Sequence, residues 1–307
     1  MRCIEKLLII TSTIDHTVDY IISKYNKEID FFRLNTDLIN DYQISITNDG
    51  WSIYHDGWKC ILHENDINGI YYRKPRFPNL DEFEEEYRSM INNDILSMIN
   101  GIVDSFNGKV LTKPSILRKY ENKIYQLMYA KKLGLSIPIS FIGNSNVEVI
   151  KMERYKSIIK PIYTGKIYKS NTCEIYQTCI FDSFHEDISF TPIYLQEYVN
   201  KSFEVRITIV KNRVFSVKIE SKDLVDWRKA YETNKYSLID VPLSIKNKLF
   251  QMMDDFNIDF GAFDFIVNED GKWIFLEVNP NGQWQWLEKA LNLDISNSII
   301  TYFKGER

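Results

Sequence analysis

Three oxygen-bearing side chains near the end of the chain have the types and spacing that could bind a metal ion. Glu277 and Asn279 are separated by one residue within an apolar run, and Asp264 lies thirteen residues before Glu277 in another apolar run. Residues 268–271, Asn-Glu-Asp-Gly, lie between the two runs and are typical of a hairpin turn. Because alternate side chains of a strand share a face, the hairpin would bring Asp264 beside Glu277 and Asn279.

Two buried carboxylates and an amide need a cation to compensate them, and hard oxygen ligands favour Mg²⁺. The alternative is a polar hairpin edge that faces water. Burial is favoured by the apolar residues that flank the three side chains, namely Phe263, Phe265, Ile274, Phe275, Leu276 and Val278. We therefore interpret the set as a magnesium–nucleotide site.

The elements that must position this site indicate an α+β protein that begins with an α/β domain. Apolar residues at alternating or helical spacing predict the strands and helices. The first part should hold a β-α-β unit, a meander, a long helix, a strand and a helix, in the order 6–12, 15–27, 29–34, 44–47, 51–54, 59–62, 81–106, 109–112 and 115–133. The second part should begin with strands from 158 to 220, followed by a helix at 243–256. The hairpin strands should follow at 260–267 and 272–278, and a final helix should begin after 282.

Composition excludes several classes of protein. The 307 residues carry 38 Lys and Arg against 42 Asp and Glu, a net charge of −4, which provides no overall positive field for nucleic acid or an anionic membrane. The four cysteines and four histidines are scattered, which argues against a zinc site or a Cys/His nucleophile. No apolar window approaches the roughly 18 residues of a membrane-spanning helix, and the N-terminus lacks a cleavage signal. We expect a soluble, cytoplasmic protein.

Further residues in a fixed order give the sequence its family likeness. Lys123 lies in an expected helix, Lys160 ends the strand Ser-Ile-Ile-Lys, Tyr-Leu-Gln-Glu-Tyr-Val occupies 194–199, and Glu204 follows. With the Asp-(thirteen on)-Glu-x-Asn pattern, this order resembles the ATP-grasp superfamily. The resemblance implies an N-terminal pre-ATP-grasp domain, 1–115, and two ATP-clasping subdomains, 116–195 and 196–307.

The resemblance also implies a role for each matched residue. Lys123 and Lys160 would contact the phosphates of ATP, and Glu204 would bind the ribose. The adenine edge would be read by the hinge, Gln196, Glu197, Tyr198 and Val199. Two Mg²⁺ ions would be held by Asp264, Glu277 and Asn279. The phosphate-covering loop departs from the pattern, because residues 163–166 contain one glycine, and neither a Walker nor a Rossmann motif occurs.

Within this superfamily the chain is similar to the graspetide synthetases, the microviridin-type maturases that cyclise ribosomal peptides. The likeness rests on segments at 71–76, 133–138, 226–228 and 279–284. It implies an ATP-dependent macrocyclase that phosphorylates an Asp or Glu side chain of a precursor peptide. A Ser/Thr hydroxyl or Lys amine of the same peptide would then displace the phosphate, giving an ω-ester or ω-amide. The partners implied are a precursor with a leader and an acidic, hydroxyl-rich core, and a second copy of the chain in a homodimer.

Three residues are candidates on the acceptor side of the reaction. Strand alternation places Arg206 on the face shared with Glu204, toward the nucleotide cleft, where it would bind phosphate or acyl phosphate. On resemblance, Arg228 would bind the acceptor carboxylate, and Asp226 would orient Arg228 or help take a proton from the nucleophile. The alternative for Asp226 and Arg228 is a surface pair near a helix start.

Arg73, Lys74 and Arg76 follow an apolar strand, at the kind of strand end where open α/β layers bind ligands. Three cations within four residues make a local anion site that could contact an acidic core peptide. The alternative is a solvated turn, with prolines at 75 and 78. The segment 173–190 is a weaker candidate for recognition of a leader by strand addition.

Two other functions stay open. One is a small-molecule carboxylate-amine ligase of the RimK or D-alanine-ligase kind, which would share the ATP site and differ in its acceptor. The other is a nucleotide-binding module without catalysis, which would not need the complete set of metal and lysine residues. The sequence does not decide between ester and amide products, or the number and order of rings.

Overall fold

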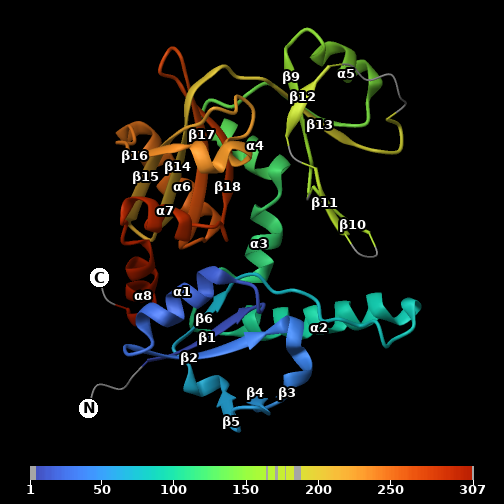
Figure 1. Cartoon of the computed structure of the whole chain (residues 1–307), viewed down its shortest axis with the longest axis vertical. Coiled ribbons are helices and arrows are strands. Elements are labelled where there is room, and N and C mark those ends of the chain that lie inside the picture. Colours follow the sequence, from blue (N-terminus) through green and yellow to red (C-terminus); the bar gives the residue numbers. More distant parts are fainter. Residues whose placement is uncertain (1–4, 164, 170–171, 177, 183–187, 306–307) are drawn as a thin grey trace.

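The computed structural model describes residues 5–305, except 164, 170–171, 177 and 183–187. Figure 1 shows an N-terminal α/β layer at one end and two further sheets at the other, joined by helices α3 and α4. Residues 177 and 183–187 of the segment expected to add a strand to a leader lie outside the described part. No helix of the described residues has the length and apolar character needed to cross a membrane.

The N-terminal layer is a parallel sheet in the order β2-β1-β6-β7. Its elements are β1 (Glu5–Thr11), α1 (His16–Tyr25), β2 (Ile29–Asn35), β6 (Gly69–Tyr72) and β7 (Lys109–Leu111). Side chains of β1 alternate between two cores: Leu7 and Ile9 pack with α1, while Leu8 and Ile10 pack with α2 (Glu85–Ser105). The expected β-α-β opening is confirmed, since β1 pairs in parallel with β2.

The expected meander is confirmed as a separate antiparallel sheet under the N-terminal layer. It comprises β3 (Tyr42–Thr47), β4 (Gly50–His55) and β5 (Cys60–His63), in that order. Short 3₁₀ turns, η1 (Thr36–Asp41) and η2 (Glu64–Asp66), lead into and out of it. Trp51, Ile53 and Leu62 join the core that also holds α2.

Two helix predictions were wrong in their bounds. The long helix expected from 81 starts at Glu85, and Tyr87 and Met90 of its first half are more than half exposed. The single helix expected over 115–133 is two helices, α3 (Pro114–Tyr120) and α4 (Lys123–Lys132). The break occurs because Asn122 leaves the helical conformation and caps α4, its Oδ1 accepting from the Tyr125 amide at 3.1 Å.

A small antiparallel sheet follows in the order β12-β9-β13-β8. It contains β8 (Ser140–Gly143), β9 (Ser157–Lys160), β12 (Cys179–Phe181) and β13 (Ile193–Glu197), and α5 (Asn146–Met152) packs against it. A hairpin of β10 (Lys166–Lys169) and β11 (Thr172–Ile175) extends from it toward α2 (Figure 1).

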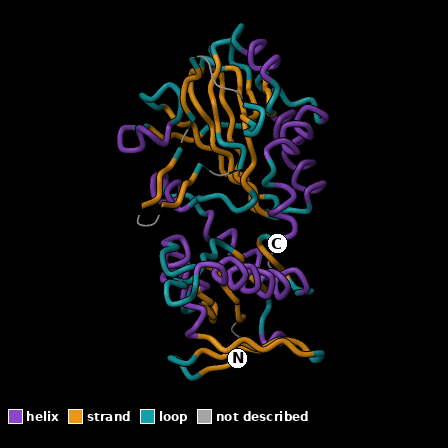
Figure 2. Tube along the Cα trace, turned by 90° about the vertical axis from the view of Figure 1, so that its right-hand side faces the viewer, coloured by secondary structure: helices purple, strands orange, loops and turns teal. Residues whose placement is uncertain are grey.

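A five-stranded antiparallel sheet, the large sheet, has the order β16-β15-β14-β17-β18. Its strands are β14 (Lys201–Val210), β15 (Arg213–Glu220), β16 (Lys235–Leu238), β17 (Phe260–Asn268) and β18 (Trp273–Asn279). Figure 2 shows these strands side by side with helices packed beside them. Helix α6 (Leu243–Phe256) contributes Leu249, Met252 and Phe256 to the core of this sheet, and the 3₁₀ turn η3 (Trp227–Thr233) lies between β15 and β16.

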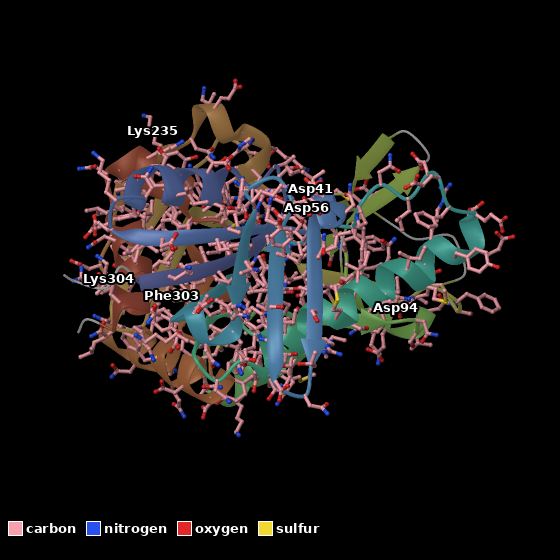
Figure 3. The ribbon with its side chains drawn as sticks, turned by 90° about the horizontal axis from the view of Figure 1, so that it is seen from below. Asp41, Asp56, Asp94, Lys235, Phe303 and Lys304 are labelled. Carbon is pink, nitrogen blue, oxygen red and sulfur yellow. The ribbon has the colours of Figure 1, made fainter. Side chains whose placement is uncertain are left out.

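The end of the chain returns to the N-terminal sheet. The final helix expected after 282 is two helices, α7 (Gln285–Leu291) and α8 (Ile295–Lys304), separated where Asn292 takes a left-handed conformation. The ring centroids of Phe303 on α8 and Tyr71 on β6 are 6.0 Å apart. Figure 3 labels Phe303 and Lys304 beside the strands of the N-terminal sheet. One apolar core therefore combines residues of the first and last parts of the chain.

A polar tie reinforces this contact. Lys24 of α1 lies 2.8 Å from the Oε1 atom of Glu288, a residue of α7 that is 3% exposed. The backbone amide of Ser296 donates to Oε2 of the same carboxylate at 2.6 Å, and the Tyr20 hydroxyl donates to Oε1 at 2.7 Å. Burial opposes ionisation of Glu288, but these donors bring its pKa below the usual value.

Candidate active site

The two carboxylates expected to bind metal lie directly opposite each other on β17 and β18. Asp264 pairs with Glu277, and Asn279 lies two residues further along β18, opposite Ala262. A β-bulge follows Asp264 and re-aims the strand at this point. Asp264 is 7% exposed, whereas the side chain of Glu277 is 33% exposed. The hairpin geometry expected from the sequence is confirmed.

Two arginines face these carboxylates. Arg206, on the strand β14 next to β17, lies 2.6 Å from Oδ2 of Asp264. Arg228, at the start of η3, lies 3.6 Å from the same oxygen and 3.8 Å from Oε1 of Glu277. Burial would raise the pKa of Glu277, but Lys123, Arg228, Lys160 and Arg206 together hold it below its usual value. Glu277 is therefore an anion under ordinary conditions.

Asp226 is committed to Arg228. As the cap of η3 it accepts from the backbone amide of Arg228 at 3.1 Å, and it accepts from Nη1 of the same side chain at 3.2 Å. Its side chain is 8% exposed. Both contacts fix the direction of the guanidinium, so the geometry favours the orienting role over the proton-accepting role.

The two lysines approach the carboxylates from other elements. Lys160 ends β9, and burial lowers its pKa to about 8, although Glu277 opposes this shift. Lys123 begins α4, and its Nζ donates to the carbonyl oxygen of Pro161 at 2.8 Å. The helix break at Asn122 is what places Lys123 in the first turn of α4. A strand end and a helix start thus bring two cations to one place.

Glu204 and the hinge line the far side of the same space. Glu204 is 7% exposed; its Oε1 accepts from Lys201 at 3.0 Å, whereas its Oε2 is buried and has no hydrogen-bond partner among the described residues. Burial raises the pKa of Glu204 to about 7, against the opposing effect of Lys201. In the hinge, the amides of Glu197 and Tyr198 already donate to carbonyl oxygens, those of Ile139 and Lys156.

Most of the predicted residues line one cavity, here called the hinge cavity. Its predicted lining residues are Lys123, Lys160, Gln196, Glu197, Tyr198, Val199, Glu204, Asp226, Arg228, Asp264 and Glu277. Apolar residues also line it, namely Ile158, Val225, Trp227, Phe265, Ile266 and Leu276. Phe265 and Leu276 were expected from the sequence only as apolar neighbours of the metal set, and not as the lining of a nucleotide pocket. Strand alternation marks several of these as inward-facing, but nothing local in the sequence distinguishes them from core residues.

Asn279 belongs to a second cavity of about 860 Å³, here called the Asn279 cavity. Lys123 and Glu277 line both cavities, so the two spaces meet at these side chains. The walls of the Asn279 cavity also include Lys74, Arg118, Glu121 and Asn281. Sequence reasoning had not selected Arg118 or Glu121, which reach this wall only because α3 ends where it does.

The three cations at 73, 74 and 76 do not face solvent together. Arg73 is 1% exposed and donates to Oδ1 of Asn281 at 3.0 Å and to Oε1 of Gln283 at 3.1 Å, and its Nε lies 3.6 Å from Asp15. Its amide donates to the carbonyl oxygen of Ile10 at 2.9 Å, so the residue continues the sheet and its side chain enters the junction between the N-terminal sheet and the loop after β18. Lys74 lines the Asn279 cavity, and Arg76 is exposed.

The loop after β18 packs tightly against the site. A Cβ atom on Gly282 would lie 2.6 Å from the Cβ of Ala262 and 3.1 Å from Nη2 of Arg206. That same Nη2 donates to the carbonyl oxygen of Gln283 at 3.2 Å, and the Asn281 amide donates to Oδ1 of Asn279 at 3.2 Å. Glycine at 282 therefore allows the loop to hold both Arg206 and Asn279.

The donor set fits a hard divalent cation. Asp264, Glu277 and Asn279 offer only oxygen atoms, the ligands that Mg²⁺ prefers. Within the described ranges, no three His, Cys, Asp or Glu side chains gather to hold a metal by themselves, so such an ion would take its further ligands from phosphate and water. The partnerless Oε2 of Glu204 likewise fits the hydroxyl donors of a ribose.

No protein-family model matches the chain, and no curated protein matches it in sequence. Solved structures do. The macrocyclase MdnC bound with precursor peptide MdnA, from Microcystis aeruginosa MRC, has a TM-score of 0.87 at 24% identity, covering 98% of this chain and 100% of that one. A RiPP-associated ATP-grasp ligase of Chryseobacterium gregarium, in complex with ADP and a leader and core peptide, has the same score and identity, covering 98% and 97%.

A third similar structure is the ATP-grasp ligase PsnB complexed with minimal precursor, Mg and ADP. Its TM-score is 0.77 at 16% identity, covering 99% of this chain and 98% of that one. The likeness extends over almost the whole chain in all three cases. The ATP-grasp fold expected from the sequence is thereby confirmed.

Proposed function

We propose that this protein is an ATP-dependent ligase that closes rings in a ribosomal precursor peptide. It would activate an Asp or Glu side chain as an acyl phosphate and join it to a Ser/Thr hydroxyl or a Lys amine of the same peptide. The observation that carries the proposal is the hinge cavity, which unites two lysines, an arginine and paired carboxylates from four separate parts of the chain. The full-length likeness to a macrocyclase bound with a precursor peptide, and to an ATP-grasp ligase in complex with a leader and core peptide, supports the choice of substrate.

ATP would lie in the hinge cavity. Lys123 and Lys160 would bind its phosphates as point charges, and Oε2 of Glu204 would accept from a ribose hydroxyl. Because the amides of Glu197 and Tyr198 have protein partners, adenine would meet the remaining polar groups of the hinge, with the side chains of Ile158 and Leu276 against its faces. The side chain of Gln196 is 1% exposed and donates to the Tyr194 hydroxyl at 2.7 Å, so it would shape the pocket floor.

Asp264, Glu277 and Asn279 would hold Mg²⁺, and we propose two ions, as in the sequence-based expectation. Bound Mg²⁺ would neutralise charge on the phosphates during transfer. Arg206 and Arg228 hold the two carboxylates in place. Arg228, directed by Asp226, would also reach the transferred phosphoryl group or the acceptor carboxylate, because half of its side chain is exposed to the cavity.

The peptide would enter the Asn279 cavity. This space meets the hinge cavity at Lys123 and Glu277, where the terminal phosphate of ATP would lie, so an acceptor carboxylate there could attack that phosphate. Lys74 supplies a positive charge at the wall for an acidic core, while Arg76 extends the cation-rich rim at the exposed turn. Arg73, which is 1% exposed among the residues around the Asn279 cavity, would act on the peptide mainly through the loop that it holds.

The remaining parts of the proposal come from the family resemblance. We propose a cytoplasmic enzyme that acts as a homodimer, with a division into parts at 1–115, 116–195 and 196–307. Residues of α4 pack in the core of the large sheet, although α4 belongs to the part 116–195. The boundary at 195/196 therefore separates the small sheet from the large sheet and does not separate α4 from the large sheet. Sedimentation at two protein concentrations tests the dimer.

The test of function uses a candidate precursor taken from a short reading frame beside the gene, rich in Thr, Ser, Lys, Asp and Glu. The protein is incubated with this peptide, ATP and Mg²⁺, and the products are read by mass spectrometry. Loss of one water per ring, with ADP release that depends on the peptide, supports the macrocyclase. Unchanged peptide mass with ADP released only by small amino acids supports a small-molecule ligase, and binding of ATP without ADP release supports an inactive module. Mild base then separates esters from amides.

A further inference from the structure

The proposed reaction needs a group that takes a proton from the nucleophile, and the residues assigned so far do not supply one. Asp226 is committed to Arg228, and Asp264 and Glu277 face the arginines as the proposed metal ligands. Resting on the proposed function, we propose that Glu121 is this general base, accepting the proton of the attacking Ser/Thr hydroxyl or Lys amine in the Asn279 cavity.

The position of Glu121 carries the proposal. It is the C-cap residue of α3, its amide donating to the carbonyl oxygen of Leu117 at 2.8 Å, and it stands two residues before Lys123. The helix break between α3 and α4 thus sets a carboxylate and a phosphate-binding cation on the same wall. Among the described residues, the carboxylates that line the Asn279 cavity are Glu121 and Glu277. Since Glu277 is assigned to the metal, Glu121 is the carboxylate left for the nucleophile.

The surroundings of Glu121 suit a base. Glu121 is exposed at the cavity wall, but partial desolvation by the surrounding protein raises its pKa, with Lys74 opposing the shift. A higher pKa makes a carboxylate a stronger proton acceptor. The charged and titratable groups that share its cavity come from several elements: Tyr72, Arg73, Lys74, Arg118, Lys123, Tyr163 and Glu277. Lys74 is the cation whose charge acts directly on Glu121, and it would keep the carboxylate ionised while a neutral hydroxyl approaches.

The step balances without a further reagent. An oxygen or nitrogen lone pair of the nucleophile forms the bond to the acyl carbon while its proton passes to the Glu121 carboxylate. The bond between that carbon and the phosphate oxygen breaks, and its electron pair leaves with inorganic phosphate. For a Lys nucleophile, the ammonium group loses a first proton before attack. Glu121 then returns its proton to phosphate or solvent.

The test compares Glu121→Gln with Glu153→Gln in the full-length protein. Glu153 is a matched control, because it too is a C-cap glutamate after a seven-residue helix, its amide donating to Val149 at 3.2 Å, and it lines neither cavity. Each variant and the wild type receive ATP, Mg²⁺ and the candidate precursor peptide. Ring formation is measured across a pH series, and acyl phosphate is trapped as hydroxamate by added hydroxylamine, whose neutral form attacks without a base.

We expect Glu121→Gln to slow ring formation by roughly 10²- to 10⁴-fold while hydroxamate forms at the wild-type rate, and to lose the acidic limb of the pH profile. Glu153→Gln should behave as wild type in both assays. Ring formation by Glu121→Gln within about twofold of wild type would overturn the proposal. So would equal loss of rings and hydroxamate, because it would place Glu121 in acceptor binding. A wild type that forms neither product refutes the proposed function itself, separately from the role of Glu121.

Discussion

Two groups of polar side chains meet at the loop that follows β18. The cavity cluster consists of Arg206, Arg228, Asp264 and Glu277, and the junction cluster consists of Asp15, Arg73, Asn281 and Gln283. Both bury ion pairs, at 2.6 Å in the first and 3.6 Å in the second. In the junction cluster the polar groups meet other protein groups on several sides: Gln283, for example, accepts from both Arg73 and Thr17. In the cavity cluster Arg228 and Glu277 also face open space.

This difference separates two uses of buried charge. A charged pair enclosed by protein contributes to attaching one part of the fold to another, and breaking it leaves an uncompensated charge. A cluster that faces a cavity leaves side chains open to a ligand: the side chains of Arg228 and Glu277 are 48% and 33% exposed, against 1% for Arg73 and 2% for Asp15. Changes in the cavity cluster should therefore act mainly on turnover, and changes in the junction cluster mainly on stability.

The largest effect is expected at Glu277. Glu277→Gln removes a proposed metal ligand at nearly constant volume. Because the variant would lose several kcal/mol of transition-state stabilisation, its peptide-dependent ADP release should fall by roughly 10³-fold or more. Unfolding in urea should change far less than for a junction variant. Glu269→Gln, on the exposed turn of the same hairpin, is the control. Near-normal turnover by Glu277→Gln would remove the metal assignment.

The converse is expected at Arg73. Arg73→Met leaves Asp15 buried without its cation and should lower the free energy of unfolding by about 3–5 kcal/mol, read from urea denaturation. Arg76→Met, at the exposed end of the same basic segment, should stay within about 0.5 kcal/mol of the wild type. If both variants were equally stable, the junction cluster would have no special part in attachment.

A smaller effect that depends on pH is expected at Glu288, which reinforces the same junction. Its pKa is lowered in the folded protein by Lys24, Ser296 and Tyr20 against the effect of burial, whereas the unfolded carboxyl titrates near about 4.3. The folded state therefore gains stability that is present above the unfolded pKa and lost as pH falls through the lowered folded pKa.

At pH 7, Glu288→Gln should lose about 1–3 kcal/mol of unfolding free energy relative to wild type. The gap should narrow in acid, below roughly pH 4. The measurement is urea unfolding of both proteins over a series of pH values. If the difference in unfolding free energy stayed constant into strong acid, packing and not charge would account for the contribution of Glu288.

The smallest effect concerns Lys160 and nucleotide affinity. Its pKa is about 8 because of burial, and a bound phosphate favours the charged form. Above pH 8, binding must take up a proton, so affinity for a non-hydrolysable ATP analogue should fall by up to about tenfold per pH unit. Lys160→Arg, which stays charged, should show a flatter dependence from pH 7 to 9 when titrated by calorimetry. Equal slopes for the two proteins would contradict this cause.

How well each feature could be predicted follows from the range of the interactions that create it. The opposition of Asp264 and Glu277 depends on one short hairpin, so alternation and a turn sequence were sufficient. The burial of Arg73 depends on residues more than 200 positions away in the loop at 281–283, and a local pattern of three cations at a strand end contains no information about that contact.

Helix boundaries show the same limit. Apolar spacing over 115–133 continues through the break, and only the side-chain cap by Asn122 divides it. With that break unrecognised, Glu121 reads as an interior helix residue, and its place on a cavity wall is invisible. The hinge and lysine assignments, in contrast, come from the order of motifs in a family, which carries tertiary information that spacing alone lacks.

Gly282 has a consequence for tolerance to mutation. The position requires a residue without a side chain, because any Cβ atom there would clash with Ala262 and Arg206. A saturation library scored for activity should therefore find this position about as intolerant as the carboxylates, although it contributes no reactive atom. A variant library for altered peptide scope should leave residue 282 fixed and diversify the neighbouring wall instead.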